Sequence, residues 1–107
     1  MTSGLEAALA GASSPSWSLR VRAGCDLARF ADVPEAADAL VRLLLDAEDS
    51  AVTRRTAEAL ARMGTVAAAR LIALADAEAD DSQADWIRTG VRDALAAMDG
   101  GPEIVAD

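Results

Sequence analysis

The sequence contains no histidine, no lysine and no tyrosine, and it has one cysteine and one phenylalanine among its 107 residues. Without histidine there is no imidazole base, which excludes a Ser-His-Asp triad, a Cys-His pair and a histidine metal site. A lone Cys25 forms neither an internal disulfide nor a multi-cysteine zinc site. These absences indicate a noncatalytic protein without cofactor or metal, and they fit a reducing cytoplasm.

We expect neither an export signal nor a membrane-spanning segment in this sequence. Residues 1–6 lack a basic start followed by a continuous apolar stretch, and no run approaches the roughly 18 apolar residues that cross a bilayer. Acidic residues number 18 against 10 arginines, which gives a net charge of −8. Because nonspecific affinity for nucleic acids requires surplus positive charge, we expect neither nucleic acid nor membrane as a partner.

Alanine is abundant, with 27 residues. Alanine has the highest helix propensity, whereas sheets draw on β-branched and aromatic residues, and aromatic residues make up only 3% of the chain. We therefore expect an all-α protein. A chain of this length buries about two-thirds of its unfolded surface, which is enough for the core of a single domain.

Three segments, residues 19–31, 52–64 and 87–99, align without gaps. In each of them the apolar positions recur at i, i+4, i+8 and i+11, which is the stripe of a helix with one buried face. The stripes are Leu19, Ala23, Leu27, Phe30; then Val52, Thr56, Leu60, Met63; then Ile87, Val91, Leu95, Met98. We expect the equivalent leucines Leu27, Leu60 and Leu95 to face one shared interior.

Shorter segments that are apolar on most sides lie between these helices, and a similar one stands near the start of the sequence. Asp49 is placed to cap the second long helix, Gly64 to end it, and residues 82–85 form a plausible capping box for the third. Gly100, Gly101 and Pro102 are expected to stop the last helix. The expected organisation is an inner helix at about 4–11, units at about 16–48 and 49–81, an outer helix at about 82–98 and a tail at 99–107.

Residues 49–64, DSAVTRRTAEALARMG, resemble the short, PBS-lyase-type HEAT repeat of small bacterial proteins, whose usual run is D-x-x-V-R-x-x-A-A-x-A-L-G-x-x-G. Thr53 departs from the pattern where such repeats often carry arginine, although Arg20 and Arg88 hold that position in the flanking units. The resemblance covers about residues 5–98 and implies a short right-handed α-solenoid of about six helices. Short HEAT repeats occur in binding scaffolds, bilin-attaching lyases and alkyl-base glycosylases, so the resemblance implies a fold rather than a reaction.

Inner helices line the concave side of such stacks, where HEAT scaffolds usually bind their partners. The residues expected to face outward there form a narrow groove that is acidic at one end: Glu35, Asp38, Arg42, Ala69 and Ala73. Glu35 and Asp38 share a helix face and could act as acid and base, but such a pair is more typical of a solvated edge. We interpret the chain as an interaction module whose acidic surface binds a basic protein or peptide.

Two residue types outside this groove also invite a functional interpretation. Trp17 and Trp86 stand near the starts of outer helices, where tryptophan often staples the chain to the core, and Trp86 is also a candidate interface anchor. Cys25 is expected to be partly exposed, with Arg22 and Arg29 near it in sequence. We interpret Cys25 as a small packing residue rather than a redox-active thiol.

Charged residues form two further patterns. The acidic run at residues 76–85 lacks the ligand spacing of a calcium loop and is expected to be a solvated loop. Arginines at equivalent repeat positions predict a solvated outer wall with pairs of opposite charge four residues apart: Arg22, Arg29, Arg55 and Arg62, with Asp26 and Glu58 between them.

Two other interpretations remain open. One is a lyase-like HEAT protein that holds a small chromophore or anionic ligand, although the missing histidine, the few aromatic residues and the small number of repeats weigh against it. The other is self-association, because the uncovered ends of so short a stack could pair with a second copy.

Overall fold

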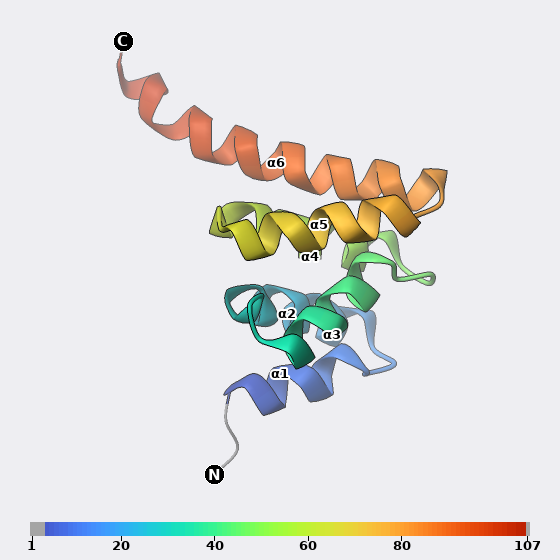
Figure 1. Ribbon diagram of the computed structural model, residues 1–107. Coiled ribbons are helices and arrows are strands. Elements are labelled where there is room, and N and C mark those ends of the chain that lie inside the picture. The colour runs from blue at the N-terminus through green and yellow to red at the C-terminus, as the bar shows by residue number, and fades with distance from the viewer. Residues whose placement is uncertain (1–3, 107) are drawn as a thin grey trace.

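The computed structural model describes the backbone of residues 4–106 and the side chains of residues 4–98, and this part of the chain contains six α-helices and no strand (Figure 1). The helices are α1 (Gly4–Ala12), α2 (Trp17–Leu27), α3 (Pro34–Leu44), α4 (Ser50–Met63), α5 (Val66–Glu78) and α6 (Asp81–Ala106), with a short 3₁₀ helix (Ala28–Phe30) after α2. The expectation of an all-α short solenoid is confirmed.

The helices form two layers that grow by one helix per repeat. The first layer holds the inner helices, with α3 between α1 and α5. The second layer holds the outer helices, with α4 between α2 and α6 (Figure 1). The stack therefore begins with α1 at one end and finishes with α6 at the other. In the second layer α4 and α6 approach closely at Gly90, where a Cβ atom would overlap the carbonyl oxygen of Arg54 and lie 2.9 Å from the Cβ of Ala57.

The repeated leucines do not all lie in the interior. Leu27 and Leu60 are fully buried, as expected, whereas the side chain of Leu95 is 53% exposed. The expectation for Leu95 is wrong because α6 is the last described helix, and no described helix covers the face that carries this residue. The centre of a stripe is buried where an inner helix follows, whereas Leu19 and Met63, at the ends of the first two stripes, are also exposed, at 49% and 41%.

Most helix ends follow the local signals in the sequence. The carboxylate of Asp49 accepts a hydrogen bond from the backbone N–H of Ala51 at 2.9 Å, and Gly64 ends α4 with a φ of 65°, which favours glycine. The capping box of α6 lies two residues earlier than expected. Asp80 Oδ1 accepts from the Gln83 N–H at 2.7 Å, and the Asp80 N–H donates to Gln83 Oε1 at 3.1 Å.

The last helix does not stop where the sequence predicts. α6 continues through Gly100, Gly101 and Pro102 to Ala106 and projects past the ends of α4 and α5 (Figure 1), so the expected tail from residue 99 is helical as far as Ala106. Proline has a φ compatible with a helix; at position 102 it removes the backbone hydrogen bond to the carbonyl of residue 98 and its ring crowds that carbonyl, which weakens the helix without ending it here. Glycine weakens a helix without ending it.

Candidate interaction surfaces

The residues expected to form one concave groove are all exposed, but they do not form one groove: Glu35, Asp38, Arg42, Ala69 and Ala73. Asp38 and Arg42 of α3 line the first depression together with Leu74 and Glu78 of α5. Ala69 and Ala73 line the second depression, between α5 and α6, and Glu35 lines neither. The division follows from helical geometry, because residues 69 and 73 point to a different side of α5 than residues 74 and 78.

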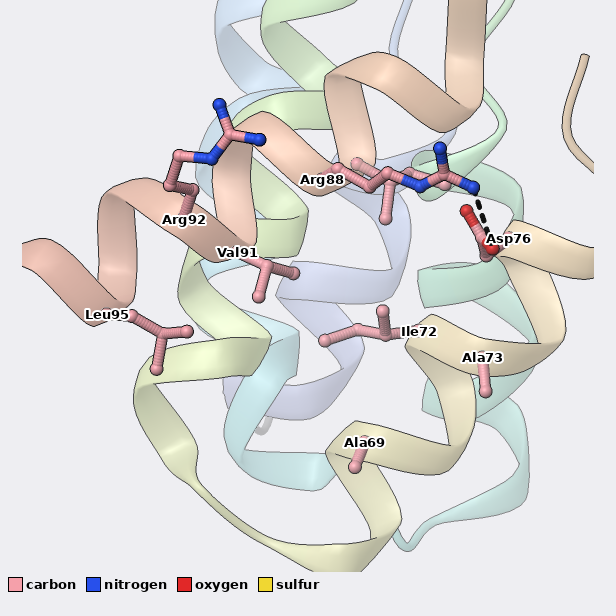
Figure 2. A pocket seen from close by; sticks show the side chains of 9 residues that line it. Ala69, Ile72, Ala73, Asp76, Arg88, Val91, Arg92 and Leu95 are labelled. Atoms are coloured by element: carbon pink, nitrogen blue, oxygen red, sulfur yellow. Dashed lines mark ion pairs between the residues drawn. The ribbon is translucent and has the colours of Figure 1, made fainter. Parts of the chain in front are cut away.

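The second depression is a groove of about 470 Å³ with an apolar floor, which we call the end groove (Figure 2). Figure 2 shows Ile72 of α5 and Val91 of α6 pointing toward one another across it, with Leu95 further along α6. The lining residues are Ala69, Ile72, Ala73, Asp76, Ile87, Arg88, Val91, Arg92 and Leu95. Sequence reasoning missed the α6 side of this groove because it placed Val91 and Leu95 in the core. The feature that leaves this side open is that the described residues contain no helix after α6.

Charged side chains form the rim of the end groove. Arg88 Nη2 lies 3.6 Å from Asp76 Oδ2, and the two side chains are 63% and 36% exposed (Figure 2). The other carboxylate oxygen of Asp76 is buried and has no hydrogen-bond partner. Arg92 is exposed. Two guanidinium groups and one carboxylate therefore give this rim a net positive charge on an otherwise acidic protein.

Both tryptophans are exposed, by 54% for Trp17 and 38% for Trp86, so the expectation that they staple their helices to the core is wrong. Trp86 lies in the second turn of α6 and lines a depression of about 190 Å³ beside the loop between α3 and α4. Four carboxylates line the same depression. We call this surface the acidic edge, formed by Asp46, Glu48, Asp49, Asp80 and Trp86.

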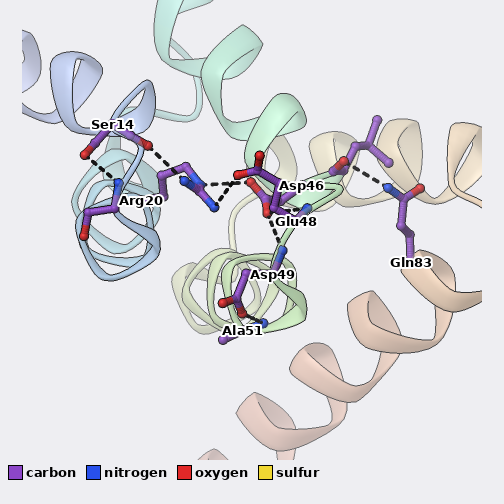
Figure 3. A network of polar contacts seen from close by, with 9 residues as sticks. Ser14, Arg20, Asp46, Glu48, Asp49, Ala51 and Gln83 are labelled. Carbon is purple, nitrogen blue, oxygen red and sulfur yellow. Dashed lines mark hydrogen bonds and ion pairs between the residues drawn. The ribbon is translucent and has the colours of Figure 1, made fainter.

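The loop that carries most of the acidic edge is held from two sides (Figure 3). Arg20 of α2 donates from Nε to Asp46 Oδ1 at 3.0 Å, and its Nη2 lies 3.3 Å from Glu48 Oε1. From the opposite side, Nε2 of Gln83 on α6 donates to the carbonyl oxygen of Leu45 at 2.9 Å. The carboxylates of this loop are therefore presented in a fixed arrangement.

Asp46 organises this loop from within. Its Oδ2 accepts hydrogen bonds from the backbone N–H groups of Glu48 at 3.1 Å and Asp49 at 2.8 Å. Arg20 also donates from Nη1 to the carbonyl oxygen of Ser14 at 2.9 Å, so one guanidinium joins two loops (Figure 3). At the equivalent positions of the next units, Thr53 is buried and Arg88 is exposed. The complete network therefore forms only around Arg20.

Charge pairs on the second layer agree in part with the sequence pattern. Arg62 and Glu58 form the expected pair on α4, at 3.4 Å, and Arg54 pairs with Asp93 of α6 at 3.3 Å.

Within the described residues, no group of histidine, cysteine and acidic side chains is arranged to hold a metal ion. None of the described helices combines the length and the apolar character needed to cross a membrane.

Cys25 is an exposed free thiol that lines a depression between α2 and α4. Desolvation in this depression raises the pKa of the thiol above its ordinary value, the guanidinium of Arg55 lowers it in part, and Asp26 and Glu58 raise it. The arginine near the sulfur is thus Arg55 of α4, rather than Arg22 or Arg29. A raised pKa leaves little thiolate at neutral pH, which supports the interpretation of Cys25 as unreactive.

We expect Cys25 to react slowly with iodoacetamide, because the thiolate is the reacting form and its fraction is reduced when the pKa is raised. The rate should increase with pH toward a midpoint above that of free cysteine in the same buffer. In the chain unfolded with urea, the midpoint should return to the value of free cysteine. A folded-state midpoint below that of free cysteine would contradict the expectation.

The family model described as HEAT repeats matches residues 5–96, from α1 into α6. Neither a search of curated proteins nor a search of solved structures returned a match. The matched residues span most of the chain: they include α2 to α5 in full, nearly all of α1 and the first 16 residues of α6. The chain therefore belongs to the HEAT repeat family.

Proposed function

We propose that this chain is a noncatalytic interaction module that binds a basic protein or peptide at its acidic edge. HEAT repeats are generally protein-interaction scaffolds, and the family is generally noncatalytic. The observation that carries the proposal is the position of Trp86, which is 38% exposed in a depression lined by four carboxylates. Arg20 compensates only one of these four negative charges, and the net negative charge that remains beside the indole suits a lysine or arginine side chain.

Three properties of the acidic edge support a basic partner. The face of an indole ring attracts a cation, and this attraction is strengthened by nearby carboxylates. The side chain of Glu48 is 78% exposed, so its carboxylate can accept further hydrogen bonds. Because Arg20 and Gln83 already fix the loop, little conformational entropy is lost when a partner binds. The net charge of −8 steers a basic partner toward the protein.

The depression between α3 and α5 is a second candidate surface for the same basic partner. It brings Asp38 and Arg42 together with Glu78 and with Leu74, whose side chain is 53% exposed. Glu35, one turn before Asp38 on α3, adds a further exposed carboxylate near the start of the helix. This surface thus contains Asp38 and Arg42 of the predicted groove but not Ala69 and Ala73.

A matched pair of tryptophan variants tests the acidic edge. Trp86→Ala and Trp17→Ala each remove an exposed indole, so both proteins should remain folded. In affinity captures from the native cell, we expect a basic partner to be recovered with the wild-type protein and with Trp17→Ala, but to be lost with Trp86→Ala. Truncation of an anchoring tryptophan weakens binding by about 30-fold or more.

Salt and a charge-reversed variant complete this test. The association rate with the captured partner should fall as the salt concentration rises, because charge attraction is screened. If Trp86→Ala recovers the partner unchanged, the acidic edge is not the binding site. Loss of the partner only in a variant with Asp38→Arg and Arg42→Asp would place binding between α3 and α5 instead.

A further inference from the structure

We propose that the end groove binds an amphipathic helix of a second partner protein, one that carries acidic residues beside its apolar face. This interaction uses a different surface from the acidic edge, and it stands whether or not a basic partner binds there.

The shape of the end groove suits a helix. α5 contributes residues at positions i, i+3, i+4 and i+7, from Ala69 to Asp76, and α6 contributes a parallel stripe from Ile87 to Leu95. Two adjacent helices that present such stripes form a trough into which the side chains of a third helix can pack. Within the stack, α3 packs in this way against α1 and α2, and α5 packs against α3 and α4. A helix in the end groove would extend the same arrangement by one position.

The floor of the groove requires large apolar side chains from the occupant. Ile72 and Val91 are half-buried and Leu95 is 53% exposed, so apolar surface remains in contact with water. Covering these side chains with leucine or a similar residue removes apolar area from water on both partners, which is the main favourable contribution to association. An extended polar peptide would not supply that area.

The charges on the rim of the end groove determine which charge the occupant must carry beside its apolar face. Arg92 is exposed, and Arg88 pairs with Asp76 at 3.6 Å while 63% of its side chain stays exposed. Both arginines lie on α6 along one side of the apolar floor (Figure 2). A helix with glutamate or aspartate on the flank facing α6 can pair with both, whereas a basic helix would be repelled.

A second copy of this chain does not supply such a helix from the other end of its stack. The fully exposed residues of α1 are small or polar (Gly4, Glu6, Ala7 and Ala10), and its two large apolar side chains, Leu5 and Leu9, are half-buried against the core of their own stack. In its place in the stack, α1 therefore offers only part of two leucines to a groove of about 470 Å³. A helix of a different protein, with a full apolar face, is the better occupant.

Two synthetic helical peptides test the proposal on the full chain. Both are about 15 residues long and carry the same leucines at positions i, i+3, i+4 and i+7. One has glutamates beside the leucines and the other has lysines at those positions. By fluorescence anisotropy with Trp86→Ala, in which the acidic edge should no longer bind a lysine peptide, we expect the glutamate peptide to bind at least about tenfold more tightly than the lysine peptide. Arg92→Glu should reduce or reverse that preference.

A matched pair of leucine variants locates the binding site. Leu95 and Leu74 are equally exposed, at 53%, but only Leu95 lines the end groove. We expect Leu95→Glu to weaken binding of the glutamate peptide by about tenfold or more, and Leu74→Glu to leave it unchanged. Trp86→Ala should bind the peptide normally, which separates this site from the acidic edge.

Three results would overturn the proposal. The first is equal affinity for the two peptides, which would remove the role of the rim arginines. The second is unchanged binding by Leu95→Glu when thermal unfolding shows that the variant is folded. The third is a molecular mass in light scattering that rises with concentration in the wild-type protein but stays monomeric in Leu95→Glu, because the groove would then be covered by a second copy.

Discussion

Replacing Arg20 by methionine is expected to lower the free energy of unfolding by about 3 to 5 kcal/mol. The side chains of Arg20 and Asp46 are only 9% and 11% exposed, so solvent provides little screening or replacement hydration. Methionine preserves the apolar stem but removes the guanidinium, and Asp46 Oδ1 then loses its donor at 3.0 Å. The carbonyl of Ser14 loses its donor as well. The loss is large because a charged carboxylate stays nearly buried without its partner.

Urea unfolding followed by circular dichroism measures this effect, and Arg54→Met is the matched control. The pair between Arg54 and Asp93 has a similar length, 3.3 Å, but its side chains are 30% and 45% exposed, so we expect a loss below about 1 kcal/mol. Equal losses in the two variants would show that burial does not determine the strength of the Arg20 pair. Adding Asp46→Asn to Arg20→Met should cost less than the sum of the two single changes.

The importance of Arg20 illustrates what one repeat position can and cannot predict. The repeat pattern identifies Arg20, Thr53 and Arg88 as equivalent, yet only Arg20 forms a buried network. Its partner Asp46 lies 26 residues later in the sequence, in a loop whose position depends on how α3 packs. Equivalence within a repeat thus predicts where a residue lies on its helix, whereas its contacts depend on the neighbouring unit.

The same distinction explains the burial of the repeated leucines. Leu27 and Leu60 are fully buried because each outer helix is followed by an inner helix that covers its stripe. Leu95 has the same place in the pattern but is exposed on the last helix. The sequence thus predicts which face of a helix is apolar. Burial requires a second surface, and the end groove is the place where that surface is not provided by the described part of the chain.

Helix ends could be predicted where the signal is local. Asp49 caps α4 and Gly64 ends it without help from distant residues. For α6, the runs beginning at Asp80 and Ser82 both resemble capping boxes. Gln83 also bonds to the carbonyl of Leu45, a contact 38 residues away that favours the Asp80 box and that no local pattern contains. Similarly, exposure of the predicted groove residues was foreseeable, but their separation depends on the rotation of α5.

Replacing Gly90 by alanine is expected to destabilise the protein by about 2 kcal/mol, although alanine is the better helix former by about 1 kcal/mol. The added Cβ would overlap the carbonyl oxygen of Arg54 and lie 3.1 Å from the backbone nitrogen of Glu58. These are backbone atoms of α4 and cannot rotate away as a flexible side chain would. The two helices must move apart, and the packing of buried residues such as Leu60 and Ile87 would loosen.

Thermal and urea unfolding of Gly90→Ala, compared with Gly4→Ala, isolates this steric effect. A Cβ at position 4 meets no atom within 4 Å, so Gly4→Ala should change stability by no more than about 0.5 kcal/mol. The difference between the two variants then gives the steric cost of separating α4 from α6 less the gain of about 1 kcal/mol from alanine's helix propensity at position 90. A Gly90→Ala protein as stable as the wild type would mean that α6 does not approach α4 so closely. Side-chain contacts alone would then have to hold α6 against α4. Because α6 also forms one side of the end groove, the groove would be wider than its lining residues indicate.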